Sequence, residues 1–119
     1  MLRPKQMTAG SMVLACKEDA ENLGNVSPDA YSELTVITKE LETTLTKAFN
    51  MEKINYLALM MVDKQVHFHV IPRYSSIRKL GDTIFEDKNW PKPPDLLQAH
   101  NMTENELNTL KIYLLKLWK

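Results

Sequence analysis

The 119-residue sequence has one cysteine, Cys16, so it can form neither an intrachain disulfide nor a metal site built from cysteines. It has only three glycines, and 44% of its residues are hydrophobic, which excludes collagen-like and broadly disordered chains. Fifteen basic residues balance fifteen acidic ones, so bulk charge provides no attraction to nucleic acid or to an anionic membrane. The longest apolar run, from Tyr56 to Val62, is too short to span a bilayer.

These features indicate a single domain over residues 1–119, large enough to bury a core without crosslinks. The first residues contain no signal-peptide hydrophobic stretch, and a lone cysteine suits a reducing compartment. We therefore expect a cytoplasmic protein. The sequence implies no tightly bound cofactor.

Two segments carry the signals of helices. The first is expected to begin after Ser27, which can cap it, and its apolar residues recur every three or four positions until it ends near Asn50. The second covers residues 103–118, where Thr103 and Glu106 have the spacing of a capping box. Each helix has one apolar face, which is expected to pack on the sheet.

Three segments are predicted as strands, at residues 11–16, 53–62 and 65–71. The segment 53–62 is apolar on both faces, which predicts a central strand that is covered on both sides. A two-residue connection then leads to the strand at 65–71, which Pro72 is expected to end.

The segment 74–101 is rich in proline, serine and aspartate and is predicted to be a long loop, with a short edge strand at 83–86 as its one candidate element. Taken together, the elements predict an α+β domain. Its sheet is small and mainly antiparallel, and two helices pack against it.

Gln65, His67 and His69 alternate on the third predicted strand, so their side chains are expected to share a face, and Phe68 lies on the other. Spacing alone allows a structural histidine pair beside the amide of Gln65. It also allows a metal site, which would need a third ligand from His100 or a distant carboxylate. Because His100 lies in an irregular segment, we expect no metal. The structural pair remains open at this point.

The segment 65–73 reads Gln-Val-His-Phe-His-Val-Ile-Pro-Arg and resembles the signature of the histidine triad (HIT) family, His-φ-His-φ-His-φ-φ followed by Pro-Arg, where φ is apolar. Glutamine occupies the first triad position, and His67 and His69 occupy the second and third. The segment 10–23 is similar to the strand and loop Gly-His-x-φ-φ-φ-Pro-Lys-x-His of the same family. The resemblance covers residues 4–73 and implies the HIT fold.

The resemblance implies chemistry at the α-phosphate of a small-molecule nucleotide, either a nucleoside phosphoramidate, a dinucleoside polyphosphate or a similar compound. The middle histidine, His67, would attack phosphorus and form a nucleotidyl-histidine, which water would hydrolyse. His69 would donate a hydrogen bond to a phosphate oxygen where charge develops. Gln65, at the first triad position, completes the catalytic set.

Three further residues are candidates for substrate binding. Arg73 follows the histidines and can pair with phosphate oxygens. Trp90 lies in a Trp-Pro segment similar to one that follows the triad in some members, and it can stack on a base or fill a packing position. Asp19 stands where many members carry a histidine.

An alternative function is a catalytically weak or inactive nucleotide-binding module that acts through a partner. Gln65 and Asp19 replace histidines of the family pattern, no glycine-rich loop precedes the histidines, and only about ten residues precede Ser11. These departures favour the alternative, whereas His67 and His69 favour the enzyme. Family members are usually two-fold dimers, so we expect a homodimer whose contact includes the first helix and the strand at 53–62.

Overall fold

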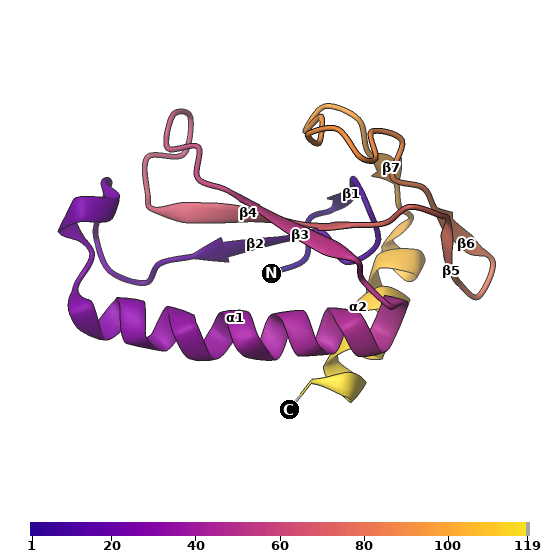
Figure 1. Ribbon diagram of the computed structural model, residues 1–119, viewed down its shortest axis with the longest axis horizontal. Helices are drawn as coiled ribbons and strands as arrows, with labels where there is room; N and C mark the ends of the chain where they lie inside the picture. Colours follow the sequence, from indigo (N-terminus) through magenta and orange to yellow (C-terminus); the bar gives the residue numbers. More distant parts are fainter. Residues whose placement is uncertain (119) are drawn as a thin grey trace.

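The computed structural model describes residues 1–118 (Figure 1). In chain order the elements are β1 (Lys5–Gln6), β2 (Met12–Ala15), the short 3-10 helix η1 (Leu23–Asn25), α1 (Pro28–Phe49), β3 (Lys53–Leu57), β4 (His67–Arg73), β5 (Arg78–Leu80), β6 (Thr83–Phe85), β7 (His100–Asn101) and α2 (Glu104–Leu117).

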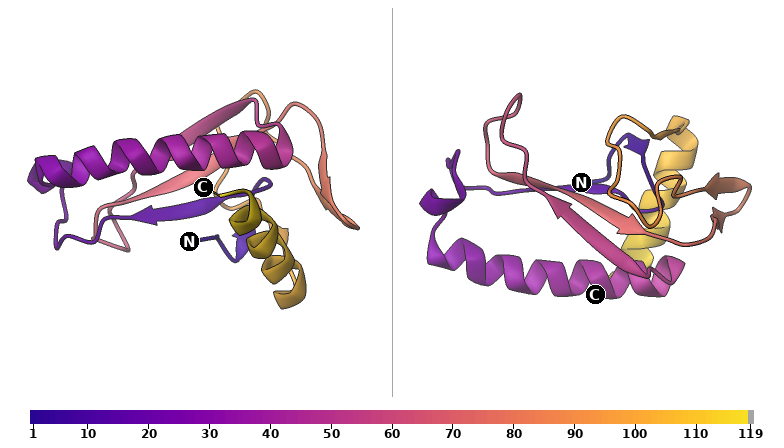
Figure 2. Two further views of the ribbon diagram at one scale, coloured as in Figure 1. Left: turned by 90° about the horizontal axis from the view of Figure 1, so that it is seen from below. Right: turned by 45° about the horizontal axis from the view of Figure 1, so that its top comes forward.

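The main sheet has three strands in the order β2-β4-β3, and both neighbours run antiparallel to β4. Two small antiparallel pairs, β1 with β7 and β5 with β6, extend the structure beyond one end of this sheet. The long helix α1 lies along one face of the sheet, and α2 lies near the end of that helix (Figure 2). The predicted α+β class is confirmed. No helix within residues 1–118 combines the length and apolarity that a transmembrane segment requires.

Both predicted helices are confirmed, together with the residues that cap them. The Ser27 hydroxyl oxygen accepts a hydrogen bond of 3.1 Å from the Ala30 amide, and α1 ends at Asn50 in a left-handed conformation with φ 53°. Thr103 and Glu106 form the expected reciprocal capping box at the start of α2. Both ends of α1 and the start of α2 are therefore determined by local sequence.

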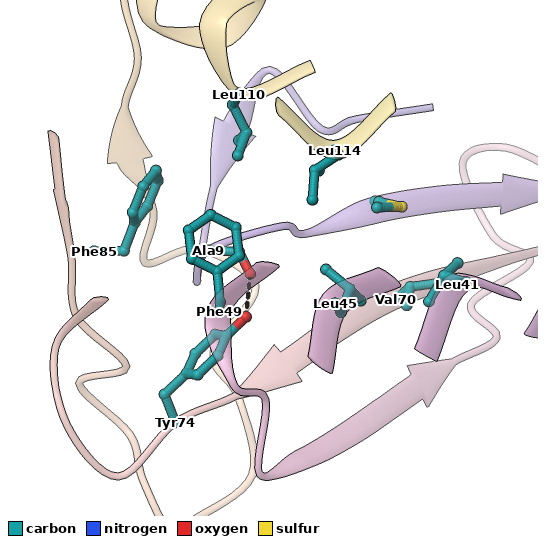
Figure 3. Close-up of a cluster of buried hydrophobic side chains, with 10 residues drawn as sticks. Ala9, Leu41, Leu45, Phe49, Val70, Tyr74, Phe85, Leu110 and Leu114 are labelled. Carbon is teal, nitrogen blue, oxygen red and sulfur yellow. Dashed lines mark hydrogen bonds between the residues drawn. The ribbon is translucent and has the colours of Figure 1, made fainter. Parts of the chain in front are cut away.

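The core lies where the C-terminal half of α1 meets β4 and α2 (Figure 3). Phe49 is its centre and makes edge-to-face contacts with Tyr74, Phe85 and Tyr113 at centroid distances from 5.6 to 6.5 Å. The Tyr74 hydroxyl donates to the Ala9 carbonyl at 2.7 Å, which connects the N-terminal segment to the residue after β4. Further buried members are Leu41, Leu45, Val70, Leu110 and Leu114.

The prediction of a central strand at 53–62 is wrong. Only β3 forms there, and it is an edge strand, while the central position belongs to β4. The rest of the apolar run is part of the connection 58–66, where Met61 and Val62 are exposed to solvent. Hydrophobicity without a clear alternation therefore did not distinguish a covered strand from an apolar loop.

The histidine strand begins two residues later than predicted and continues through Pro72 to Arg73. Proline is tolerated because β2 pairs with β4 only as far as Val70, so by Pro72 the strand has a single partner. The segment 74–101 is also not a plain loop. It contains the hairpin β5–β6, which confirms the predicted short strand, and β7, a two-residue strand that pairs with the distant β1.

The approach of Gly10 to α1 generates a stability prediction. Gly10 has φ +88°, and a Cβ atom there would overlap the Leu45 side chain, whereas a Cβ on Gly24 would meet nothing within 4 Å. Gly10→Ala should therefore lower the free energy of unfolding by about 2 to 4 kcal/mol through backbone strain and overpacking. The matched control Gly24→Ala should change it by less than about 0.5 kcal/mol. Urea unfolding of both variants measures this, and equal stabilities would contradict the packing described here.

Candidate active site

His67 is the first residue of β4, and the residue is only 4% exposed. Its Nδ1 lies 2.7 Å from the backbone carbonyl oxygen of Gln65. A carbonyl oxygen can only accept, so we assign the proton to Nδ1, and Nε2 then carries the lone pair. The backbone therefore selects the tautomer that a nucleophilic imidazole needs.

His69 lies on the same face of the sheet, with its ring centroid 5.2 Å from that of His67 and the ring planes at 80°. Its Nδ1 is buried and has no hydrogen-bond partner within residues 1–118. Burial lowers the pKa of His69, and the positive charge of Arg3 and the neighbouring His67 lower it further. His69 is therefore neutral near pH 7 and has one ring N–H to donate.

Gln65 lies before the strand, and its side chain does not join the histidine face. The amide Nε2 donates to the Cys16 carbonyl oxygen at 2.9 Å and also to the Glu18 carbonyl oxygen. This corrects the expectation that the Gln65 side chain shares a face with the histidines. The free carbonyl groups of the loop after β2 hold the amide, and Gln65 touches His67 only through its backbone oxygen. Asp19 is exposed in the same loop.

Arg73 lies at the other end of β4, and its guanidinium is fully engaged. Its Nε is 2.6 Å from Asp87 Oδ2 in an ion pair whose side chains are 5% and 2% exposed. The two Nη atoms donate to Asn55 Oδ1 at 2.8 Å and to the Lys92 carbonyl oxygen at 2.7 Å. Arg73 is six positions along the strand from His67, which is about 20 Å. The structure does not bring Arg73 to the histidines, and instead this residue fixes the loop that follows β6.

Trp90 belongs to that same loop, which Figure 1 shows near β1 and β7. It is half-buried, and its backbone amide donates to the Asp87 carbonyl oxygen at 3.4 Å. Trp90 is thus anchored at the Arg73 end of β4 and not beside His67. Two roles were predicted for Trp90, stacking on a base or filling a packing position, and this placement agrees with the packing position.

Arg3 is a residue of the histidine face that the sequence did not reveal. Residues 1–3 pair with β2: the Arg3 amide donates to the Ser11 carbonyl oxygen at 3.0 Å, and Leu2 forms a bridge with Met12. Since opposed residues of antiparallel strands share a face, Arg3 lies on the side of the sheet that carries His69. A pairing of three residues leaves no alternation in the sequence, so no local signal could have identified it.

Within residues 1–118 no group of three His, Cys, Asp or Glu side chains is placed to hold an ion. His100 is not near the other two histidines: its Nε2 accepts from the Glu86 amide at 3.0 Å, and its ring lies 5.9 Å from that of Phe85. A cavity of about 340 Å³ lies between α1 and the sheet, where Phe68 lines it. That cavity is on the face opposite the two histidines.

The family model described as "HIT domain" matches residues 5–76. A solved histidine triad protein from Sinorhizobium meliloti 1021 is 26% identical, with a TM-score of 0.77 over 97% of this chain and 78% of its own. No curated protein matches the sequence significantly.

Two other solved structures are more distant in sequence and show the fold alone. A histidine triad protein from Marinobacter aquaeolei VT8 is 21% identical, with a TM-score of 0.77 over 98% of this chain and 79% of its own. A protein from Sulfolobus tokodaii strain7, described as a hypothetical histidine triad nucleotide-binding protein, is 17% identical, with a TM-score of 0.70 over 98% of this chain and 74% of its own.

The surroundings of His69 generate a titration prediction. Its imidazole should titrate below the ordinary histidine pKa of about 6.5, because burial and the charge of Arg3 both disfavour the protonated ring. Arg3→Gln removes the second cause and should raise the pKa of His69 part of the way back. Imidazole NMR shifts followed from pH 4 to 9 measure both values. A His69 that titrates at or above the ordinary pKa would contradict the environment described here.

Proposed function

The chain belongs to the histidine triad family through its HIT domain, and from this premise we propose that it binds a nucleoside phosphate and hydrolyses it at the α-phosphorus. The observation that carries the proposal is the hydrogen bond from His67 Nδ1–H to the Gln65 carbonyl oxygen. It leaves Nε2 of His67 as a neutral nucleophile in a fixed orientation.

In the proposed reaction, Nε2 of His67 attacks the α-phosphorus and forms a P–N bond, while the bond from phosphorus to the leaving group breaks. The leaving group departs with the electron pair of that bond. Water then attacks the same phosphorus, releases the nucleoside monophosphate, loses a proton to solvent and restores neutral His67. The ring N–H of His69, whose centroid is 5.2 Å from that of His67, donates to a phosphate oxygen as charge accumulates there.

The substituted first triad position limits the chemistry. An amide carries no titratable proton, and the Gln65 amide already donates to two carbonyl oxygens. Gln65 therefore supplies no proton to the leaving group. This observation also favours a second candidate function, a nucleotide-binding module with little turnover that acts through a partner.

We also propose that the protein is a cytoplasmic homodimer. The outer edge of β3 is unpaired among the described residues, and Tyr31 and Val36 of α1 are exposed, at 41% and 56%. A two-fold axis at this edge would place β3 beside its copy and cover the exposed part of α1. The single free cysteine, Cys16, agrees with a reducing compartment.

The assembly has a direct test with a matched pair of variants. Light scattering should give a mass of about twice the chain mass of 13.8 kDa. Val36→Lys should shift the protein toward the monomer, because it places a charge in the proposed contact. Ile84→Lys changes a residue that is 50% exposed on β6, outside that contact, and should leave the mass unchanged. A concentration-independent monomer would overturn the dimer.

The catalytic proposal predicts AMP release from a fluorogenic adenosine phosphoramidate or from diadenosine polyphosphates. His67→Ala should abolish this release and also the nucleotidyl adduct that intact-mass spectrometry detects after rapid quenching. His69→Ala should slow turnover by about 10²- to 10³-fold, the usual effect of losing one donor to developing charge. His100→Gln, remote from β4's histidines, is the matched control and should retain full activity.

Two results would redirect the proposal. Undiminished turnover by the His67→Ala protein would show that another group is the nucleophile. Nucleotide binding without AMP release by the unmodified protein would select the binding module instead of the hydrolase.

A further inference from the structure

Arg3 has a defined position relative to the two histidines. On β2, Val13 pairs with His69 of β4, and Ser11, two residues earlier on the same face, pairs with Arg3. Arg3 is therefore two strands across the sheet from His69 and one row farther from His67. The charge of Arg3 is close enough to lower the pKa of His69, which agrees with this placement.

The guanidinium of Arg3 has no anionic partner within residues 1–118. Its one side-chain hydrogen bond runs from Nη1 to the sulfur of Met7 at 2.9 Å, and a thioether is a weak acceptor. The other two arginines of the sequence form ion pairs, Arg73 with Asp87 and Arg78 with Glu52. Arg3 is half-buried, and its remaining donors have no protein acceptor and are open to solvent, since no Arg3 nitrogen is among the buried unpaired atoms. Such a group is suited to bind an anion.

The order of the three side chains along the face fits an in-line displacement. His67 is the proposed nucleophile, His69 comes next, and Arg3 lies beyond it. In an in-line reaction the leaving group departs on the side opposite the nucleophile, which here is the side of Arg3. An amine leaving group needs a proton, and the Gln65 amide cannot supply one. A phosphate chain departs as an anion and needs none.

We propose that Arg3 forms an anion subsite beside His69 that binds the phosphate next to the one His67 attacks. The substrates it favours are then nucleoside or dinucleoside polyphosphates rather than phosphoramidates. This inference rests on the proposed function and identifies its substrate class. As the P–N bond to His67 forms, the bond from the α-phosphorus to the bridging oxygen breaks. That oxygen keeps the electron pair and leaves as a terminal phosphate oxygen, which accepts hydrogen bonds from Arg3.

Calorimetric binding of AMP and ADP to the full chain tests the subsite without requiring turnover. The unmodified protein should bind ADP about tenfold more tightly than AMP, the usual effect of charge-assisted hydrogen bonds to one more phosphate. Arg3→Gln should abolish that preference and leave AMP binding within about twofold, since the AMP phosphate meets His69. Arg3→Lys should retain part of the preference because it keeps the charge. Lys5→Gln, an exposed lysine two residues away, is the matched control and should keep the full preference.

Steady-state kinetics provide a second test of the Arg3 subsite. In the Arg3→Gln protein, kcat/KM for diadenosine polyphosphates should fall about tenfold relative to kcat/KM for the phosphoramidate. Circular dichroism and the unfolding midpoint establish that each variant is folded.

The possible results distinguish the Arg3 subsite from the proposed function on which it rests. Equal affinity of the unmodified protein for ADP and AMP, or a preference that survives in Arg3→Gln, overturns the subsite and leaves nucleotide binding intact. Failure of both nucleotides to bind overturns the proposed function and the subsite with it. An Arg3-dependent preference without any AMP release supports the subsite in the binding-module alternative.

Discussion

The structure depends on the pairing of β4 along both of its edges. Val13 on one side and Leu57 on the other are both in register with His69, so the strand cannot shift without breaking two ladders. A shift of one residue would place Phe68 and Val70 where the histidines are now and expose the core. Because side chains alternate along β4, one face of the strand packs in the core against α1, and the other face carries the two imidazoles.

The contacts around β4 fix its ends by different means. At the C-terminal end, the buried pair of Arg73 and Asp87 attaches the loop after β6, and the close approach of Gly10 to Leu45 sets the distance between the N-terminal turn and α1. At the N-terminal end, the side chain of Gln65 attaches the start of the strand to the loop after β2. The side chain of Gln65 therefore has a structural role, which is to hold the start of β4 against the loop after β2.

Features that depend on neighbouring residues could be predicted from the sequence. The cap at Ser27 and the shared face of His67 and His69 follow from local spacing, and the structure reproduces both. Features that depend on distant residues could not. Arg73 reads as a free cation in the sequence because its partner follows fourteen residues later, and Arg3 reads as part of an unstructured start because its place comes from pairing with β2. Local pattern therefore identified the shared face of the two histidines but not the positions of Arg3 and Arg73.

The distribution of satisfied and unsatisfied polar groups separates structural residues from those suited to bind a ligand. Buried polar groups in folded proteins are generally hydrogen-bonded, and Arg73 with its four protein acceptors follows that rule. His69 Nδ1 does not follow it, and Arg3, on the same face of the sheet, has no anionic partner among the described residues. Natural sequences tolerate such unpaired groups chiefly at functional sites. A neutral imidazole at His69 and an unpaired cation at Arg3, on the face that carries the proposed nucleophile His67, form an arrangement suited to an extended anionic substrate.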